Sequence, residues 1–188
     1  EDLPFFLGLM EHLAQHGFVC PTPLHGRDGP ALRTLCGRPA AIVTFLEGMW
    51  PRRILPAHCA GLGEAMAELH IAARGFALTR ANDLSLKGWR RLLDATKANA
   101  HQVQMGLADE LARELDSLEN SWPRDLPQGV IHADLFPDNT FFLDGKLSGI
   151  IDFYFACNDA LAYDLAIGLN AWCFAPDLSF NITKARLL

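Results

Sequence analysis

Several features that would assign a chain to a broad class are missing from this sequence. No apolar stretch reaches the roughly 18–20 residues needed to cross a bilayer, so the sequence predicts no membrane span. Lys and Arg form no block, and the formal net charge is −6. That charge argues against nucleic acid or an anionic membrane surface as the main partner.

The cysteine pattern of a disulfide framework or of a zinc site is also missing. The five cysteines are scattered, odd in number and form no C-x-x-C pair. Reduced thiols in a cytoplasmic protein are the simplest interpretation of that pattern.

The chain is long enough to bury a sizeable core, since it has 188 residues of which 50% are hydrophobic. This length predicts one domain, or one domain and a fragment. The first residue is Glu1 rather than Met, and residues 183–188 look like the start of another helix. We therefore expect the sequence to be a fragment of a longer protein.

The most informative segment spans residues 130–153, with the sequence VIHADLFPDNTFFLDGKLSGIIDF. A short apolar strand leads into Asp134, and Asn139 follows five residues later. The pair Asp144-Gly145 stands between two apolar runs, which is a strong signal for a β-hairpin with a type I′ turn. A hairpin carries the chain out and back, so we expect Asp152 to return close to Asn139.

Three such oxygen-bearing side chains suit phosphoryl transfer. Mg²⁺ prefers one or two protein oxygens together with phosphate oxygens and water, and a further carboxylate can accept the proton of an incoming hydroxyl. Protein kinases use H-R-D-x-x-x-x-N followed by D-F-G, whereas here Ala133 replaces the Arg and Tyr154 replaces the Gly. The alternative is a polar loop whose Asp and Asn only cap backbone groups.

The rest of the chain alternates between helical patterns and short apolar runs. Helices are predicted over residues 3–16, 57–74, 86–99, 103–121 and about 160–174. Residues 32–38 and 39–46 read as two strands joined by a glycine turn, and a turn-rich connector spans residues 123–129.

This order predicts an α+β, protein-kinase-like fold with two lobes. Residues 1–48 are expected to form the remainder of a small lobe and a hinge, and residues 49–188 a mostly helical large lobe with the catalytic loop and metal site. Adenine is then expected to lie against the backbone of Phe45, Leu46 and Glu47. The alternative for that segment is an ordinary strand end.

Longer segments of the sequence indicate a more specific family. HADLFPDN, GIIDFYFACND, YDLAIGLNAWCF, SFNITK and the opening EDLPFFLGLMEHLAQHGFVCPTPL are similar to those of bacterial homoserine kinases of the aminoglycoside phosphotransferase and choline kinase-like group. The resemblance extends over essentially the whole chain. It implies a protein-kinase-like fold and ATP-dependent phosphorylation of the hydroxyl of L-homoserine, a step toward threonine.

The resemblance also implies a role for each polar residue of the motif. Asp134 matches the catalytic base, while Asn139 and Asp152 match the residues that hold Mg²⁺ and thereby the phosphates of ATP. His132 is expected to order the catalytic loop, and Asp164 to brace it. The alternatives are an ordinary loop histidine for His132 and a helix-dipole partner for Asp164.

Two further polar residues lie outside the motif. His70 is expected to pack on its helix rather than to bind a ligand. Asn158, with the residue after it, is expected to cap the last long helix, although contact with substrate is the alternative.

The sequence also departs from the kinase pattern. It contains no glycine-rich phosphate-covering loop and no strand Lys for the α- and β-phosphates, so the isolated chain is expected to be weakly active or inactive. Other acceptors such as aminoglycosides, choline or methylthioribose, a nucleotide-binding pseudokinase, and a metal-dependent hydrolase using His132 and Asp134 stay open as alternatives.

Overall fold

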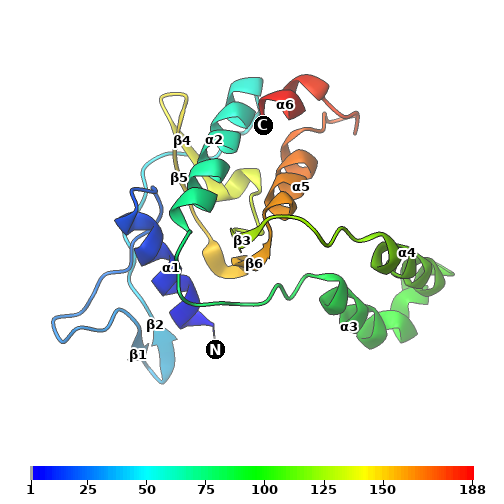
Figure 1. Ribbon diagram of the computed structural model, residues 1–188, viewed down its shortest axis with the longest axis horizontal. Helices are drawn as coiled ribbons and strands as arrows, with labels where there is room; N and C mark the ends of the chain where they lie inside the picture. The colour runs from blue at the N-terminus through cyan, green and yellow to red at the C-terminus, as the bar shows by residue number, and fades with distance from the viewer. Residues whose placement is uncertain (1) are drawn as a thin grey trace. The chain divides into compact units, whose positions relative to one another are not determined.

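The computed structural model describes residues 2–188, which divide into two compact units. The first, called here the large unit, comprises the chain as far as Arg80 together with Pro127–Leu188. The second, called here the helical hairpin, is Ala81–Leu126. Figure 1 shows the helices and strands of both. Within residues 2–188, no helix is both long and apolar enough to cross a membrane.

Within residues 2–188, the α-helices of the large unit are α1 (Leu3–Gln15), α2 (Pro56–Ala72), α5 (Leu161–Trp172) and α6 (Ile182–Leu187). The apolar face predicted for the first helix is buried, with Leu9 and Leu13 fully enclosed. These side chains share one core with Leu62 and Leu69 of α2 and with Trp172 of α5. The helical periodicity of the sequence therefore predicted these elements to within a few residues.

Three two-stranded antiparallel sheets complete the large unit (Figure 1). They pair β1 (Arg33–Leu35) with β2 (Arg38–Ala40), β3 (Gln128–Ile131) with β6 (Cys157–Ala160), and β4 (Thr140–Leu143) with β5 (Lys146–Ile150). In the turn between β4 and β5, Asp144 and Gly145 have φ angles of 51° and 78°. Positive φ at both positions is what a type I′ turn requires, so the hairpin predicted from Asp-Gly is confirmed.

Two parts of the sheet structure differ from expectation. The predicted strands over residues 32–38 and 39–46 shorten to β1 and β2, because residues 42–44 pair instead with residues 22–24. Leu24 N–H donates to Ile42 O at 2.8 Å and Thr44 N–H donates to Thr22 O at 2.9 Å. No strand is predicted from the sequence over residues 157–160, but these residues form β6 because they pair with β3.

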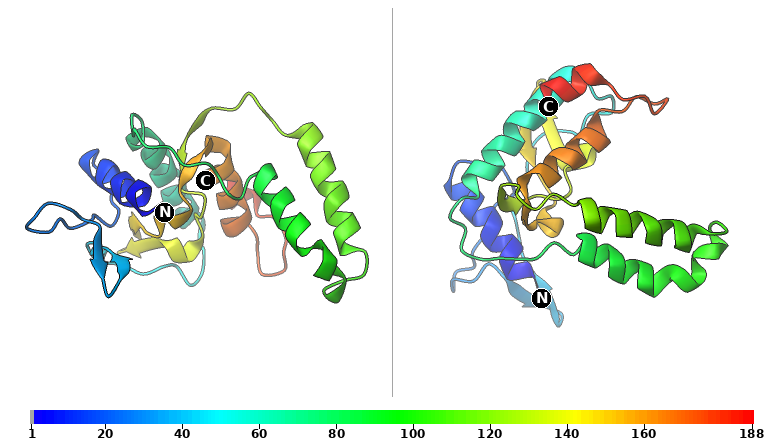
Figure 2. Two further views of the ribbon diagram at one scale, coloured as in Figure 1. Left: turned by 90° about the horizontal axis from the view of Figure 1, so that it is seen from below. Right: turned by 45° about the vertical axis from the view of Figure 1, so that its right-hand side comes forward.

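The helical hairpin contains α3 (Leu86–Thr96), a 3₁₀ turn η1 (Lys97–Gln102) and α4 (Leu107–Ser121). Figure 2 shows α3 and α4 running side by side. The rings of Trp89 and Trp122 meet edge to face at 5.7 Å, and Arg90 bridges to Asp116 at 2.8 Å. The two helices predicted here are thus present, and the second begins four residues later than expected, at Leu107.

Candidate active site

The three motif residues follow the ends of three short elements. Strand β3 leads into Asp134, the 3₁₀ turn η2 (Pro137–Asn139) ends at Asn139, and Asp152 lies two residues beyond β5. Ile151 N–H donates to Asn139 O at 2.9 Å, which closes the open end of the β4–β5 hairpin. The hairpin thereby returns Asp152 to the neighbourhood of Asn139.

Asn139 is fixed by its side-chain amide. Its Nδ2 donates to Asp134 Oδ2 at 2.8 Å and to the backbone oxygen of Asp134 at 2.9 Å. The residue is buried, with 8% of its surface exposed. Because Nδ2 is used in this way, Oδ1 is the atom left to bind a cation or a further donor.

The environment of Asp134 changes its acidity. Burial raises the pKa of its carboxyl above the usual value, the neighbouring His132 and the hydrogen bond from Asn139 oppose that rise, and the charges of Asp152 and Asp138 add to it. A carboxylate with a raised pKa is a better proton acceptor. A general base in this position would benefit from that rise in pKa.

The loop before Asp134 is held by a buried carboxylate from α5. Asp164 is fully buried, and its two oxygens accept the N–H of His132 at 2.9 Å and the N–H of Ala133 at 2.8 Å. Ala133 has φ 62°, a left-handed conformation that costs energy in any residue with a Cβ. The two hydrogen bonds offset that cost and fix the direction in which the loop leaves β3.

A third donor to Asp164 was missed at the level of sequence. His70 Nε2 lies 2.8 Å from Asp164 Oδ2, although the two residues are 94 positions apart. His70 belongs to α2, where its helical position suggested packing only. No local pattern could have found this contact, because it depends on how α2 lies against α5.

His132 connects the loop before Asp134 to the β4–β5 hairpin. Its Nε2 lies 3.0 Å from the backbone oxygen of Ile151, the residue before Asp152, so Nε2 carries the proton. The other ring nitrogen, Nδ1, is buried and has no hydrogen-bond partner within residues 2–188. Burial lowers the pKa of the imidazole, against the pull of Asp164 and of the Ile151 carbonyl. His132 is therefore neutral and acts as a donor.

Asn139 and Asp152 form an oxygen donor set suited to Mg²⁺. Asp152 is exposed and has φ 63°, and across residues 2–188 no hydrogen bond or ion pair to its carboxylate is seen. One carboxylate and one amide oxygen fit a cation that completes its shell with phosphate oxygens and water. In the described part of the chain, no group of three or more His, Cys, Asp or Glu side chains could hold a metal.

The predicted base-binding segment lies beside the same hairpin. Phe45 is 88% exposed, and Glu47 accepts a hydrogen bond from Ser148 Oγ of β5 at 2.7 Å. A one-residue bridge follows, in which Met49 and Phe142 of β4 exchange backbone hydrogen bonds of 2.9 and 3.0 Å.

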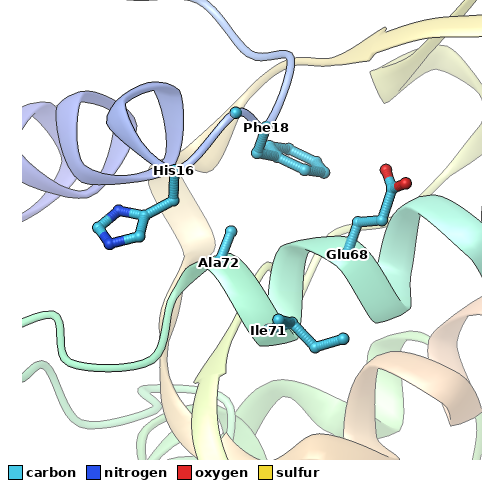
Figure 3. A pocket seen from close by; sticks show the side chains of 6 residues that line it. His16, Phe18, Glu68, Ile71 and Ala72 are labelled. Atoms are coloured by element: carbon cyan, nitrogen blue, oxygen red, sulfur yellow. The ribbon is translucent and has the colours of Figure 1, made fainter.

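A separate pocket of about 320 Å³ lies between the end of α1 and α2. Figure 3 shows Phe18 above it and Glu68 and Ile71 of α2 along its side. None of the residues that line it belongs to the motif or to the base-binding segment.

Comparison with known proteins assigns the chain to a family. The model of the phosphotransferase enzyme family matches residues 1–188. The chain belongs to this family. It is 64% identical over 194 residues to homoserine kinase of Paramagnetospirillum magneticum, a match that covers 100% of this chain and 60% of that protein. It is 66% identical over 187 residues to homoserine kinase of Bradyrhizobium diazoefficiens, covering 99% and 57%.

The chain thus spans less than two thirds of the length of these curated relatives. Among solved structures, spectinomycin phosphotransferase in complex with ADP and spectinomycin has a TM-score of 0.73 at 13% identity, covering 100% of this chain and 63% of that one. Amicoumacin kinase in complex with AMP-PNP, Ca²⁺ and Ami has a TM-score of 0.69 at 18% identity, covering 95% of this chain and 56% of that one. The α+β, protein-kinase-like fold predicted for this family member is confirmed.

Proposed function

We propose that the protein from which this chain comes is an ATP-dependent kinase that phosphorylates the hydroxyl group of L-homoserine. The observation that carries the proposal is the identity of more than 60% to homoserine kinases over the whole chain. Two features support a kinase reaction at this site. Asn139 donates a hydrogen bond to Asp134, and the carboxylate of Asp164 accepts a hydrogen bond from the backbone N–H of His132.

In this proposal Asp134 orients the substrate hydroxyl and accepts its proton as the oxygen attacks the γ-phosphorus of ATP. ADP leaves on the opposite side, and the product is the phosphate ester. Asn139 and Asp152 hold Mg²⁺, which when bound neutralises the charge of the phosphates. Positioning and electrostatics supply most of the acceleration, so the protein's main task is to keep these groups rigid.

The remaining parts of the proposal concern binding. Residues 45–47 bind the adenine through their backbone, with residues 1–48 as the remainder of the small lobe and residues 49–188 as the large lobe. His132 and Asp164 order the catalytic loop. The working compartment is the cytoplasm, and the partners are ATP and a small hydroxylated substrate.

The test is ADP release by the full-length protein with Mg²⁺ and homoserine, choline, methylthioribose or kanamycin. We expect turnover with homoserine alone. In Asp134→Asn, kcat should fall by about 10²–10⁴, the contribution of a general base, while the Kd for ATP changes by less than about threefold. Asp138→Asn, an exposed carboxylate four residues away, is the matched control and should keep most of the activity.

Two outcomes would redirect the proposal. Transfer to another acceptor would keep the kinase and change the substrate. ATP binding without transfer to any acceptor would favour a nucleotide-binding module that lacks catalysis. Full activity of Asp134→Asn would contradict the role of Asp134 as the base.

A further inference from the structure

The segment that precedes α2 is joined to strand β5 by a side chain. Ser148 Oγ donates to Glu47 O at 2.7 Å across a sequence separation of 101 residues. Two residues along, Met49 N–H donates to Phe142 O at 3.0 Å, and Met49 O accepts from Phe142 N–H at 2.9 Å. Residues 47–49 are therefore hydrogen-bonded to both strands of the β4–β5 hairpin.

Two glycines allow this close approach. Gly48 has φ 132°, and a Cβ there would lie 3.0 Å from Phe142 O and would collide with Ser148 Oγ. A Cβ at Gly149 would lie 2.6 Å from Cδ1 of Leu46 and 3.2 Å from Val19 O. A Cβ at Gly48 would therefore press on the hairpin, and one at Gly149 would displace the side chain of Leu46.

The same hairpin carries the residues of the proposed metal site. Strand β4 begins directly after Asn139, β5 ends two residues before Asp152, and the bond from Ile151 N–H to Asn139 O ties the two ends together. The hairpin thus connects the base-binding segment to the proposed metal site. Its geometry sets the distance between the two.

We propose that Ser148 is a positioning residue for the nucleotide base, and that its hydroxyl selects adenine by fixing residues 45–47. This inference rests on the proposed function. With the Glu47 carbonyl occupied by Ser148, the other backbone groups of the segment are held in one register. Adenine and guanine present opposite donor and acceptor patterns on the matching edge, so a fixed register distinguishes them, whereas a mobile segment does not.

The test uses the full-length protein and three ligands. Kd values for ATP, GTP and inorganic tripolyphosphate are measured by displacement of a fluorescent ATP analogue, with Mg²⁺, for wild type, Ser148→Ala and Ser148→Thr. In Ser148→Ala, the Kd for ATP should rise by about threefold to tenfold, as expected for one lost hydrogen bond. The preference for ATP over GTP should fall by a similar factor, and the Kd for tripolyphosphate should not change.

Two controls separate positioning from folding. Ser148→Thr keeps the hydroxyl and should retain the base preference. Ser121→Ala removes another hydroxyl–carbonyl hydrogen bond, the 2.8 Å contact to Ser117 O in the helical hairpin, and should leave all three Kd values as in wild type. Thermal unfolding of each variant confirms that it is folded.

An unchanged ATP preference in folded Ser148→Ala would overturn the inference. So would an equal loss of affinity for ATP and for tripolyphosphate, since that would indicate a general loosening. Because Kd values do not depend on transfer, a wild type that binds ATP with base preference but phosphorylates nothing would overturn the proposed function alone. A wild type that binds no nucleotide would overturn both.

Discussion

At the scale of single residues, the carboxylate of Asp164 organises the site. A fully buried charge is costly unless hydrogen bonds satisfy it, and Asp164 has partners on the catalytic loop and on α2. The loop amides of His132 and Ala133 contribute two of these, and His70 contributes the third. The proposed site therefore depends on a fully buried residue that lies outside the motif.

His70→Leu should leave the buried carboxylate of Asp164 without one of its three hydrogen-bond donors. We expect the free energy of unfolding to fall by about 1.5–3 kcal/mol, the usual contribution of a hydrogen bond to a charged group. Urea unfolding measures the change. His101→Leu, at an exposed histidine of the helical hairpin, is the control and should change stability by less than about 0.5 kcal/mol. Equal stability of both variants would show that Asp164 does not need His70.

His132 makes stability depend on pH. Burial lowers its pKa in the native state, so the unfolded chain, with an ordinary pKa of about 6.5, binds a proton that the native state does not. The contribution of neutral His132 to the free energy of unfolding is therefore present above pH ~6.5, and it is lost as the pH falls below that value. One proton corresponds to at most about 1.4 kcal/mol per pH unit.

The measurement compares urea unfolding of wild type and His132→Phe between pH 8 and pH 5. The variant loses the hydrogen bond to Ile151 O and should be less stable at pH 8. Below pH ~6.5 the wild type should lose stability more steeply, so the difference between the two proteins narrows. Parallel curves would contradict a neutral, buried His132.

At the scale of elements, the β4–β5 hairpin is the part on which the proposed site depends most. Its turn needs positive φ at Gly145, where an added Cβ would meet no atom within 4 Å. A substitution there therefore tests backbone strain without a steric clash.

Gly145→Val should destabilise the protein by about 1–2 kcal/mol, the cost of a left-handed conformation for a residue with a Cβ. Gly145→Asn should cost less, because Asn tolerates that conformation. Chemical unfolding of the two variants gives the comparison. If the Val and Asn variants are equally stable, the turn does not keep its type I′ geometry in solution.

Elements also show where sequence patterns succeed and fail. The periodicity of residues 3–16 and the Asp-Gly pair both act over a few residues, and both gave correct elements. Strand β6 has the sequence Cys-Asn-Asp-Ala, which carries no strand signal, and it is extended because β3 pairs with it. Such a strand depends on a partner distant in sequence.

At the scale of the whole molecule, the helical hairpin is inserted in the sequence between Arg80 and Pro127, and both of these residues are hydrogen-bonded within the large unit. Asn158 N–H donates to Arg80 O at 2.7 Å, and Leu161 N–H donates to Pro127 O at 2.9 Å. Arg80 and Pro127 both belong to the large unit. We therefore expect these hydrogen bonds of the large unit to form without the helices between Arg80 and Pro127.

Replacing residues 86–121 with a flexible Gly/Ser linker of about eight residues should leave the large unit folded. In the full-length protein, we expect the Kd for ATP to stay within about threefold of wild type, because none of the proposed nucleotide and metal residues lies in the replaced segment. Fluorescent-nucleotide titration and circular dichroism provide the measurement. Loss of nucleotide binding with an intact fold would assign the helical hairpin a part in the nucleotide site.

The sequence by itself determined the motif, the β-hairpin that returns Asp152, and the positions of the helices. These depend on spacing, turn chemistry and periodicity, which act between near neighbours. It also identified Asp164, but only through resemblance to relatives.

Only the tertiary structure decided that His70 binds Asp164, that β6 pairs with β3, and that Ser148 holds Glu47. In the first and last of these pairs the partners are 94 and 101 residues apart. A hydrogen bond between such partners leaves no local pattern, because its geometry is fixed by the packing of helices and strands around a shared core.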